Sequence, residues 1–354
     1  MTLLRNANNV LPLAPNANLV VTGPSADSVT NQLGGWSVSW QGVFGAGHVC
    51  CMGPPDQIPP ATTVLHGMQA ADPNVVYAPD QASAVAAAAS ADAVIVVVGE
   101  KAYAEGLGDN PTPALPADQQ SLIAALKATG KPVIVVVIAG RPLGLGPAET
   151  ADALLMAYLP GTEGGTGVAD VLFGKVNPSG HLPVTWPAAS DHNAGDFQSG
   201  GVSTAGDEPK FFDQLAGTNS GQGSGYNARY PFGFGLSYTT FQTSGLSATS
   251  SVSAHDNVTA TFTVTNTGAR AGADVVPVYV HQPTSDVLVP RQRLVGFARV
   301  TLDPGQSQNA NVSFPVDELA VTPADIDGTG RPAVEPGSYQ LQVGGMTANF
   351  SVAS

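Results

Sequence analysis

The sequence has few charged residues, and basic residues are the scarcer kind. Its 354 residues include 13 Lys and Arg against 27 Asp and Glu, a formal net charge of −14 at pH 7. Nucleic-acid binding needs clustered Lys and Arg to neutralise phosphates, so this balance excludes a nucleic-acid partner. No apolar run reaches the roughly 18 residues of a transmembrane helix, so we expect no membrane partner either.

Metal-ligand and cofactor signatures are also missing. The two cysteines, Cys50 and Cys51, are adjacent, which excludes a disulfide framework and the CxxC spacing of a metal site. The six histidines form no HxxxH or HExxH arrangement. DIDGTG at 325–330 begins like a calcium loop but lacks the closing glutamate, and GVFGAGH at 42–48 lacks the GK[ST] of a phosphate loop. We therefore expect no metal ion and no cofactor.

The N-terminal segment MTLLRNANNVLPL does not have the pattern of a signal peptide. It contains one Arg and no apolar stretch followed by a small-residue cleavage site. Two interpretations follow: the protein is cytoplasmic, or its natural start lies upstream of Met1.

Residues 18–187 alternate between two patterns. Nearly continuous apolar, β-branched runs predict strands at 18–21, 74–78, 92–99, 131–140 and 153–161. Helical patterns lie between or after them, at 62–71, 80–91, 116–130 and 165–176. Continuous apolar strands are typical of a sheet covered on both faces, and strand–helix alternation indicates βαβ units. The fold class expected here is α/β, a mostly parallel sheet with helices on both faces.

The pattern changes after residue 190. Residues 190–225 are rich in Gly, Ser, Asp and Asn and predict an irregular excursion. From about residue 240 the sequence is all-β, with strict alternation at 257–266. About seven short strands in about 115 residues without a Cys pair predict a fibronectin type III-like sandwich. We place the domains at 1–235 and 240–354.

Several ionisable side chains lie close together in the segment after the strand at 92–99, in a chain otherwise poor in charge. It carries Glu100, Lys101, Tyr103, Glu105 and Asp109. Ligands of open parallel sheets bind at the carboxyl ends of strands, which makes this loop a candidate site. The alternative is that Glu105 is a solvated loop carboxylate and Glu100 a capping or core-rim group.

GGWSVSWQG at 34–42 holds two of the three tryptophans of the chain, Trp36 and Trp40. Exposed indole rings provide a large contact area for the apolar face of a sugar ring. The alternative is that both rings fill a core beneath a loop.

Seven motifs follow one another in the order and with the spacing of a known family. They are LLRNANNVLPL (3–13), VVTGPSAD (20–27), GGWSVSWQG (34–42), ATTVLHGM (61–68), VVVGEKAYAEGLGDN (96–110), PGTEGGTGVADVLFGKVNPSGHLPVTWP (160–187) and YPFGFGLSYTTF (230–241). Together they resemble glycoside hydrolase family 3, and within it the β-glucosidases and exo-β-glucan glucohydrolases. The resemblance runs from residue 3 to the C-terminus.

The resemblance implies a domain arrangement. Members of the family begin with a (β/α)₈ barrel, continue into an α/β sandwich and often add a fibronectin type III-like domain. This chain resembles the family from the segment that links barrel to sandwich, so the barrel and its nucleophilic aspartate are absent from it. The implied partner is a family 3 barrel, as a missing N-terminal part or a separate chain, and the chain alone is expected to be inactive. Low charge with 41 Gly and 29 Pro is typical of a secreted or periplasmic polysaccharide enzyme.

The resemblance also implies site residues. In the exo-glucanase branch the acid/base is the glutamate of a loop reading Tyr-x-Glu-x-x-Gly-Asp, which matches Tyr103, Glu105, Gly108 and Asp109. Glu105 is therefore the expected acid/base of a retaining mechanism on a β-glucan or gluco-oligosaccharide. The GGW-x-x-x-W motif implies an aglycone contact by Trp40, supported by Trp36.

Two features depart from the family, and two other functions stay open. Arg or Lys often stands where this chain has His181, and the segment at 48–60 has no family form. One alternative is a non-catalytic carbohydrate-binding or scaffolding protein that keeps the two tryptophans. The other, a cytoplasmic nucleotide-binding protein, is disfavoured because a phosphate loop is lacking.

Overall fold

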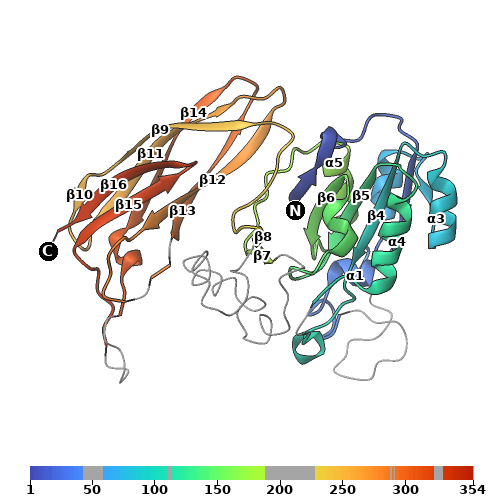
Figure 1. The fold of residues 1–354 in the computed structure, drawn as a ribbon, viewed down its shortest axis with the longest axis horizontal. Helices are drawn as coiled ribbons and strands as arrows, with labels where there is room; N and C mark the ends of the chain where they lie inside the picture. The colour runs from blue at the N-terminus through green and yellow to red at the C-terminus, as the bar shows by residue number, and fades with distance from the viewer. Residues whose placement is uncertain are drawn as a thin grey trace. The chain divides into compact units, whose positions relative to one another are not determined.

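The computed structural model describes residues 1–42, 59–110, 113–187, 228–287, 289–290, 292–322 and 330–353. These residues form two compact units, one up to Tyr238 and one from Thr239 onward (Figure 1). Cys50, Cys51, the excursion at 190–225 and most of the segments at 42–48, 48–60 and 325–330 lie outside the described residues. In the described part of the chain, no helix is long and apolar enough to span a bilayer.

The first unit is built on a six-stranded sheet in the order β1-β6-β5-β4-β2-β3. The strands are β1 (Thr2–Asn6), β2 (Leu19–Thr22), β3 (Val76–Tyr77), β4 (Ala93–Gly99), β5 (Val133–Ile138) and β6 (Ala153–Tyr158). All neighbours pair in parallel except β1, which runs antiparallel to β6. The predicted mostly parallel sheet is confirmed. A short pair, β7 (Trp186–Pro187) with β8 (Ala228–Tyr230), lies outside this sheet.

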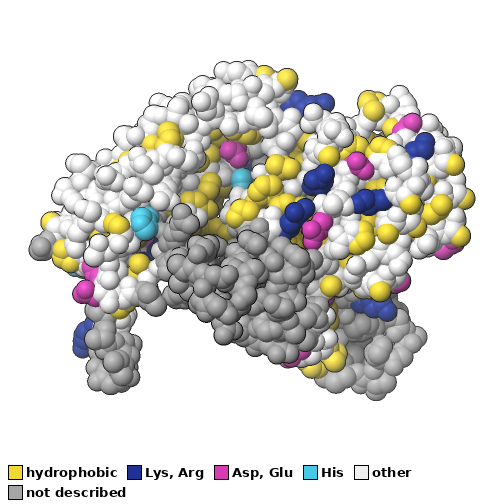
Figure 2. Space-filling view, viewed as in Figure 1, with side chains coloured by type: hydrophobic (Ala, Val, Ile, Leu, Met, Phe, Trp, Pro, Cys, Tyr) yellow, Lys and Arg dark blue, Asp and Glu magenta, His cyan; other side chains and the backbone are white. Residues whose placement is uncertain are grey.

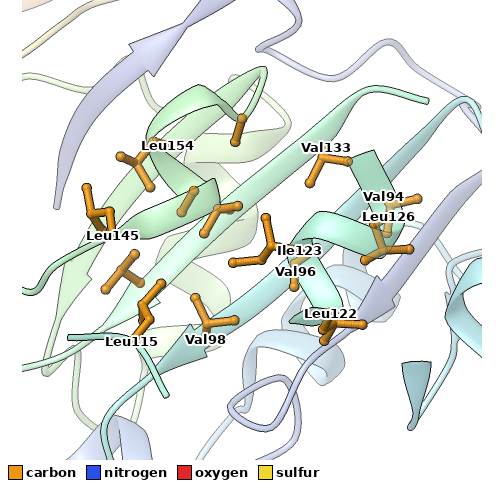
Figure 3. Close-up of a cluster of buried hydrophobic side chains, with 14 of the residues drawn as sticks. Val94, Val96, Val98, Leu115, Leu122, Ile123, Leu126, Val133, Leu145 and Leu154 are labelled. Carbon is orange, nitrogen blue, oxygen red and sulfur yellow. The ribbon is translucent and has the colours of Figure 1, made fainter. Parts of the chain in front are cut away.

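Helices cover both faces of this sheet, as predicted. They are α1 (Val29–Leu33), α2 (Val64–Ala71), α3 (Gln81–Ala88), α4 (Ala117–Lys127) and α5 (Gly164–Leu172), with 3-10 turns η1 (Ala7–Asn9), η2 (Glu105–Gly108) and η3 (Gly146–Thr150). On one face α3 and α4 pack on the sheet, and Figure 3 shows Leu122, Ile123 and Leu126 of α4 beside valines of β4 and β5. On the other face α2 and α5 pack against the alternate residues of the same strands.

Two strands differ from the sequence-based expectation. The run at 74–78 forms only the two-residue edge strand β3, and Val76 and Tyr77 are exposed instead of covered. β1 was not predicted as a strand, because Arg5 and Asn6 end the short apolar run of Leu3 and Leu4.

The strand order places a crevice at the carboxyl ends of β2 and β4. The chain leaves β2 toward the edge strand β3 and leaves β4 toward β5, so the connections diverge between these two neighbours. Ligand sites of open α/β sheets lie at such switch points. A cleft of about 560 Å³ lies there, and its walls include Asn31 after β2 and Lys101 after β4.

The second unit is a sandwich of two sheets, β10-β16-β15-β12-β13 and β14-β11-β9. Its elements are β9 (Phe241–Ala248), β10 (Ser251–Val252), β11 (Asn257–Asn266), β12 (Gly272–His281), β13 (Arg293–Leu302), β14 (Ser307–Pro315), η5 (Val316–Leu319), β15 (Gly337–Val343) and β16 (Met346–Val352). Along β11 the apolar side chains from Val258 to Val264 are buried, and alternating threonines bond to β14 on the outer face. The predicted fibronectin-type sandwich is confirmed.

The burial of β4 predicts the effect of a matched pair of substitutions. Val96 in β4 is fully buried, whereas Val76 in β3 is 52% exposed. We expect Val96→Ala to lower the free energy of unfolding by about 2 to 3 kcal/mol, because two methyl groups leave a cavity in a packed core. Val76→Ala should cost less than about 1 kcal/mol. Equal losses for the two variants in chemical denaturation would contradict the assigned packing.

Candidate functional site

The candidate loop begins where β4 ends, at Gly99. A Cβ on this glycine would lie 1.8 Å from the Ile138 carbonyl oxygen of β5, so a side chain there would push the two strands apart. The buried Gln119 of α4 bonds to both backbone groups of Gly99, accepting from the N–H at 2.8 Å and donating to the carbonyl at 2.9 Å. The start of the loop is therefore fixed to the sheet and to α4.

An ion pair stands at the base of the loop. Arg141, three residues after β5, donates from Nη2 to Glu100 Oε1 at 2.7 Å and from Nε to both carboxylate oxygens at 3.2 Å. The two side chains are only 19% and 14% exposed. Tyr103 adds a hydrogen bond from its hydroxyl to Glu100 Oε2 at 2.9 Å. Charge-assisted, fork-shaped bonds of this kind fix geometry as well as adding energy.

The same arginine also contacts the far end of the loop. Its Nη1 donates to the carbonyl oxygen of Gly108 at 2.7 Å, and its guanidinium carbon lies 4.8 Å from the centre of the Tyr103 ring. Gly108 lies so close to that ring that a Cβ would approach Tyr103 Cδ2 to 2.2 Å. Residues at the start, the middle and the end of the loop are thus held by one side chain.

Burial and the neighbouring Glu100 carboxylate raise the pKa of Tyr103 well above its usual range, although Arg141 acts in the opposite direction. The ring is half-buried. Tyr103 therefore stays a neutral phenol and keeps the proton that it donates to Glu100.

Glu105 lies at the tip of this loop, as the first residue of η2. Its side chain is exposed, and within the described part of the chain its carboxylate has no ion pair or hydrogen bond. Leu107 beside it is 74% exposed, and Asp109 is exposed as well. The loop thus presents a free carboxylate on an anchored base.

The tryptophan segment forms a tight turn after α1. The N–H of Trp36 donates to the carbonyl oxygen of Trp40 at 2.9 Å, and Ser37 and Ser39 form an isolated bridge. Trp36 is 70% exposed, whereas Trp40 is partly buried and its ring centre lies 6.3 Å from that of Trp36. The indole Nε1 of Trp40 is buried and unbonded within the described residues.

Gln41 joins the tryptophan turn to the carboxylate loop. Its buried amide donates to the Ala104 carbonyl oxygen at 3.0 Å and accepts from the Ala104 N–H at 2.8 Å. The backbones are also in direct contact, since a Cβ on Gly35 would lie 2.0 Å from the Tyr103 carbonyl oxygen. The structure therefore brings the two segments singled out in the sequence together in one unit.

Three residues of these two loops have left-handed backbone conformations that non-glycine residues adopt rarely. The φ angles are 58° at Trp36, 65° at Val38 and 51° at Glu105. Such conformations cost energy and are maintained only where surrounding contacts impose them. Because these conformations occur at Glu105 and around Trp36, we infer that the fold imposes the directions of the side chains there.

The site includes two residues that sequence reasoning missed, Arg141 and Gln41. The only signal for Arg141 was its position after the strand at 131–140, matching that of Glu100 after 92–99. Gln41 stood within the tryptophan motif without a signal of its own. His181 lies elsewhere, with Nδ1 2.6 Å from the Gly233 carbonyl oxygen. Among the described residues, no group of three His, Cys, Asp or Glu side chains is placed to hold a metal ion.

Comparison with known proteins gives a consistent family. Residues 1–238 match the model of the glycosyl hydrolase family 3 C-terminal domain, and residues 274–347 match that of the fibronectin type III-like domain. A periplasmic beta-glucosidase of Salmonella typhimurium is 35% identical over 90% of this chain and 43% of its own length. A lysosomal beta glucosidase of Dictyostelium discoideum is 34% identical over 97% of this chain and 42% of its own length.

Solved structures agree with these relatives. A beta-glucosidase mutant from Listeria innocua, in complex with laminaribiose, superposes with a TM-score of 0.80 and 26% identity over 100% of this chain and 48% of its own length. The chain thus spans less than half the length of each of these three proteins. The resemblance drawn from the motifs is confirmed: the chain belongs to glycoside hydrolase family 3, as a C-terminal domain of that family with a fibronectin type III-like domain.

Proposed function

We propose that this chain is the acid/base-carrying part of a retaining, exo-acting β-glucosidase or β-glucan glucohydrolase. It hydrolyses terminal β-glucosyl residues when joined to a family 3 barrel, and it is inactive alone because the nucleophile belongs to the barrel. The observation that carries the proposal is Glu105, an exposed carboxylate that has no bonding partner among the described residues and lies at the tip of a loop whose base is anchored. We place the two domains at 1–235 and 240–354.

The proposed chemistry assigns Glu105 two successive roles. In a retaining mechanism one carboxylate attacks the anomeric carbon while the second protonates the departing oxygen. The second carboxylate then removes a proton from the water that releases the sugar. Glu105 would be this second group, and an exposed position suits it because another domain has to complete the pocket around it.

The two tryptophans support binding on the leaving-group side. Trp36 exposes most of its ring, and Trp40 packs beside it. An aromatic ring stacks on the apolar face of a sugar and needs no charge on the ligand. Asp109 is exposed and can accept a hydrogen bond from a sugar hydroxyl, whereas the Tyr103 hydroxyl already donates to Glu100, so substrate would contact the Tyr103 ring.

A neutral substrate agrees with the low charge of the chain, of which only 11% of the residues are charged. Outside the atoms drawn in grey, Figure 2 shows mainly apolar and uncharged atoms, with few Lys, Arg, Asp and Glu side chains among them. A glucan carries no charge, so its binding makes no demand for clustered charges of either sign. We further propose that the full-length protein is secreted or periplasmic, which agrees with its similarity to the periplasmic beta-glucosidase of Salmonella typhimurium.

A non-catalytic carbohydrate-binding module is the second candidate, and the exposure of Trp36 favours it. Calorimetric titration of the isolated chain with gluco-oligosaccharides separates the two. Measurable binding by the chain alone supports the module, whereas the enzyme proposal expects none, since most of the sugar pocket would belong to the barrel.

Substitution of Glu105 tests the catalytic role in the barrel-containing protein. We expect Glu105→Gln to lower kcat/KM for alkyl glucosides by about 100- to 10,000-fold, because their poor leaving groups need a proton. For dinitrophenyl glucoside, kcat/KM should change less than about tenfold, because that leaving group departs without one.

Two controls accompany this measurement. Glu318→Gln removes an exposed carboxylate of the second unit and should leave both substrates unaffected. Azide should restore dinitrophenyl glucoside turnover in Glu105→Gln, because this anion attacks the glycosyl intermediate without a general base. Equal losses of kcat/KM on both substrates, with no azide effect, would count against the acid/base role.

Substitution of Trp36 tests the binding role. Trp36→Ala should raise KM for gluco-oligosaccharides roughly tenfold, the equivalent of about 1.4 kcal/mol, because a stacking surface is lost. Trp36→Phe should retain most of the affinity. The matched control is Phe297→Ala, which removes a 63% exposed ring from β13 of the second unit. An unchanged KM in Trp36→Ala, or the same rise in Phe297→Ala, would refute the assignment.

A further inference from the structure

We infer that Arg141 is the positioning residue of the proposed acid/base: it holds the Glu105 loop closed at its base and thereby sets where the Glu105 carboxylate lies. The inference rests on the proposed function of Glu105. In this role Arg141 acts through the loop and not on the substrate, because its side chain contacts Glu100, Tyr103 and Gly108.

One side chain closes the Glu105 loop at its base. Glu100 and Gly108 lie on opposite sides of Glu105 in the chain, and Arg141 bonds to both of them at 2.7 Å. One rigid guanidinium therefore joins the two ends of the loop. The seven residues at 101–107 lie between the two bonded positions and include Glu105, and their freedom is limited by the separation that Arg141 imposes.

The guanidinium of Arg141 cannot be replaced by a simple positive charge. It donates to a carboxylate and to a carbonyl while its central carbon lies over the Tyr103 ring, 4.8 Å from the ring centre. A lysine ammonium is a compact charge without a planar fork, so it can pair with Glu100 but cannot keep all three contacts.

The rate of proton transfer depends strongly on distance. A general acid has to lie within hydrogen-bond reach of the oxygen that it protonates. A misplacement of about 1 Å can cost a factor of about 100 in rate. A loosened loop would therefore weaken acid catalysis even though Glu105 itself is unchanged.

The test is Arg141→Lys in the barrel-containing protein. We expect kcat/KM for alkyl glucosides to fall about 10- to 100-fold, while that for dinitrophenyl glucoside changes less than about threefold. KM for the activated substrate and the thermal midpoint should stay close to those of the parent protein, because the charge pair with Glu100 is kept. A merely structural role would lower both kcat/KM values together.

A matched control exists in the same unit. Arg229 pairs with Glu149 at 3.5 Å, donates to the Glu149 carbonyl oxygen at 3.3 Å and lies 5.7 Å from the Tyr230 ring centre. It makes the same three kinds of contact away from the Glu105 loop. Arg229→Lys should leave the ratio of the two kcat/KM values unchanged. A selective fall of kcat/KM for alkyl glucosides in Arg229→Lys would overturn the inference.

Two results distinguish the positioning role of Arg141 from the acid/base role of Glu105. If Glu105→Gln shows no leaving-group dependence, the proposed function fails. If the loss of kcat/KM depends on the leaving group in Glu105→Gln but not in a folded Arg141→Lys, only the positioning role of Arg141 fails. Should Arg141→Lys not fold, Glu100→Gln serves instead, because it weakens the ion pair while keeping an acceptor of the same shape; an unchanged leaving-group dependence there also overturns the inference.

Discussion

The burial of two neighbouring strands, β4 and β5, along their whole length is the constraint on which the rest of the first unit depends. Strands covered on both faces cannot carry charge within the sheet, so the polar chemistry of these segments begins where the strands end. Because the strands are parallel neighbours, both ends lie at one edge of the sheet. Glu100 and Arg141 therefore emerge side by side, and their ion pair becomes the base of the loop that carries Glu105.

In this arrangement the base of the Glu105 loop is held rigidly and its tip is exposed. The base of the loop is held by side chains that are mostly buried, namely those of Arg141, Glu100 and Gln41, whereas the side chains at its tip are exposed. The acid/base role proposed for Glu105 needs this combination, because a group that completes a pocket on another domain must be reachable and yet held in one place. The left-handed conformation of Glu105 agrees with the same account, since only an anchored loop can maintain it.

Much of the fold was predictable from periodicity, and the site was predictable in part. Continuous apolar runs located β4, β5 and β6, and the alternation at 257–266 located β11 with its correct inner face. β1 and the five-residue α1 were missed because such short elements depend on their neighbours for stability. The loops of Glu105 and Trp36 were recognised from their residue types. The contact between the two loops was not predicted, because Gln41 and Ala104 are 63 positions apart in the sequence. The ion pair at the base of the Glu105 loop was not predicted either, because Glu100 and Arg141 are 41 positions apart.

One measurement tests the central claim most directly, namely that this unit delivers Glu105 to a nucleophile on another domain. It is the crystal structure of the barrel-containing protein with a fluorinated glucosyl unit trapped on its nucleophile. The account predicts that the Glu105 carboxylate lies about 5 to 5.5 Å from that nucleophile, on the leaving-group side of the sugar, with Arg141 bonded to Glu100 and Gly108. A Glu105 carboxylate about 6.5 Å or more from the nucleophile, or another acid in its place, would contradict it.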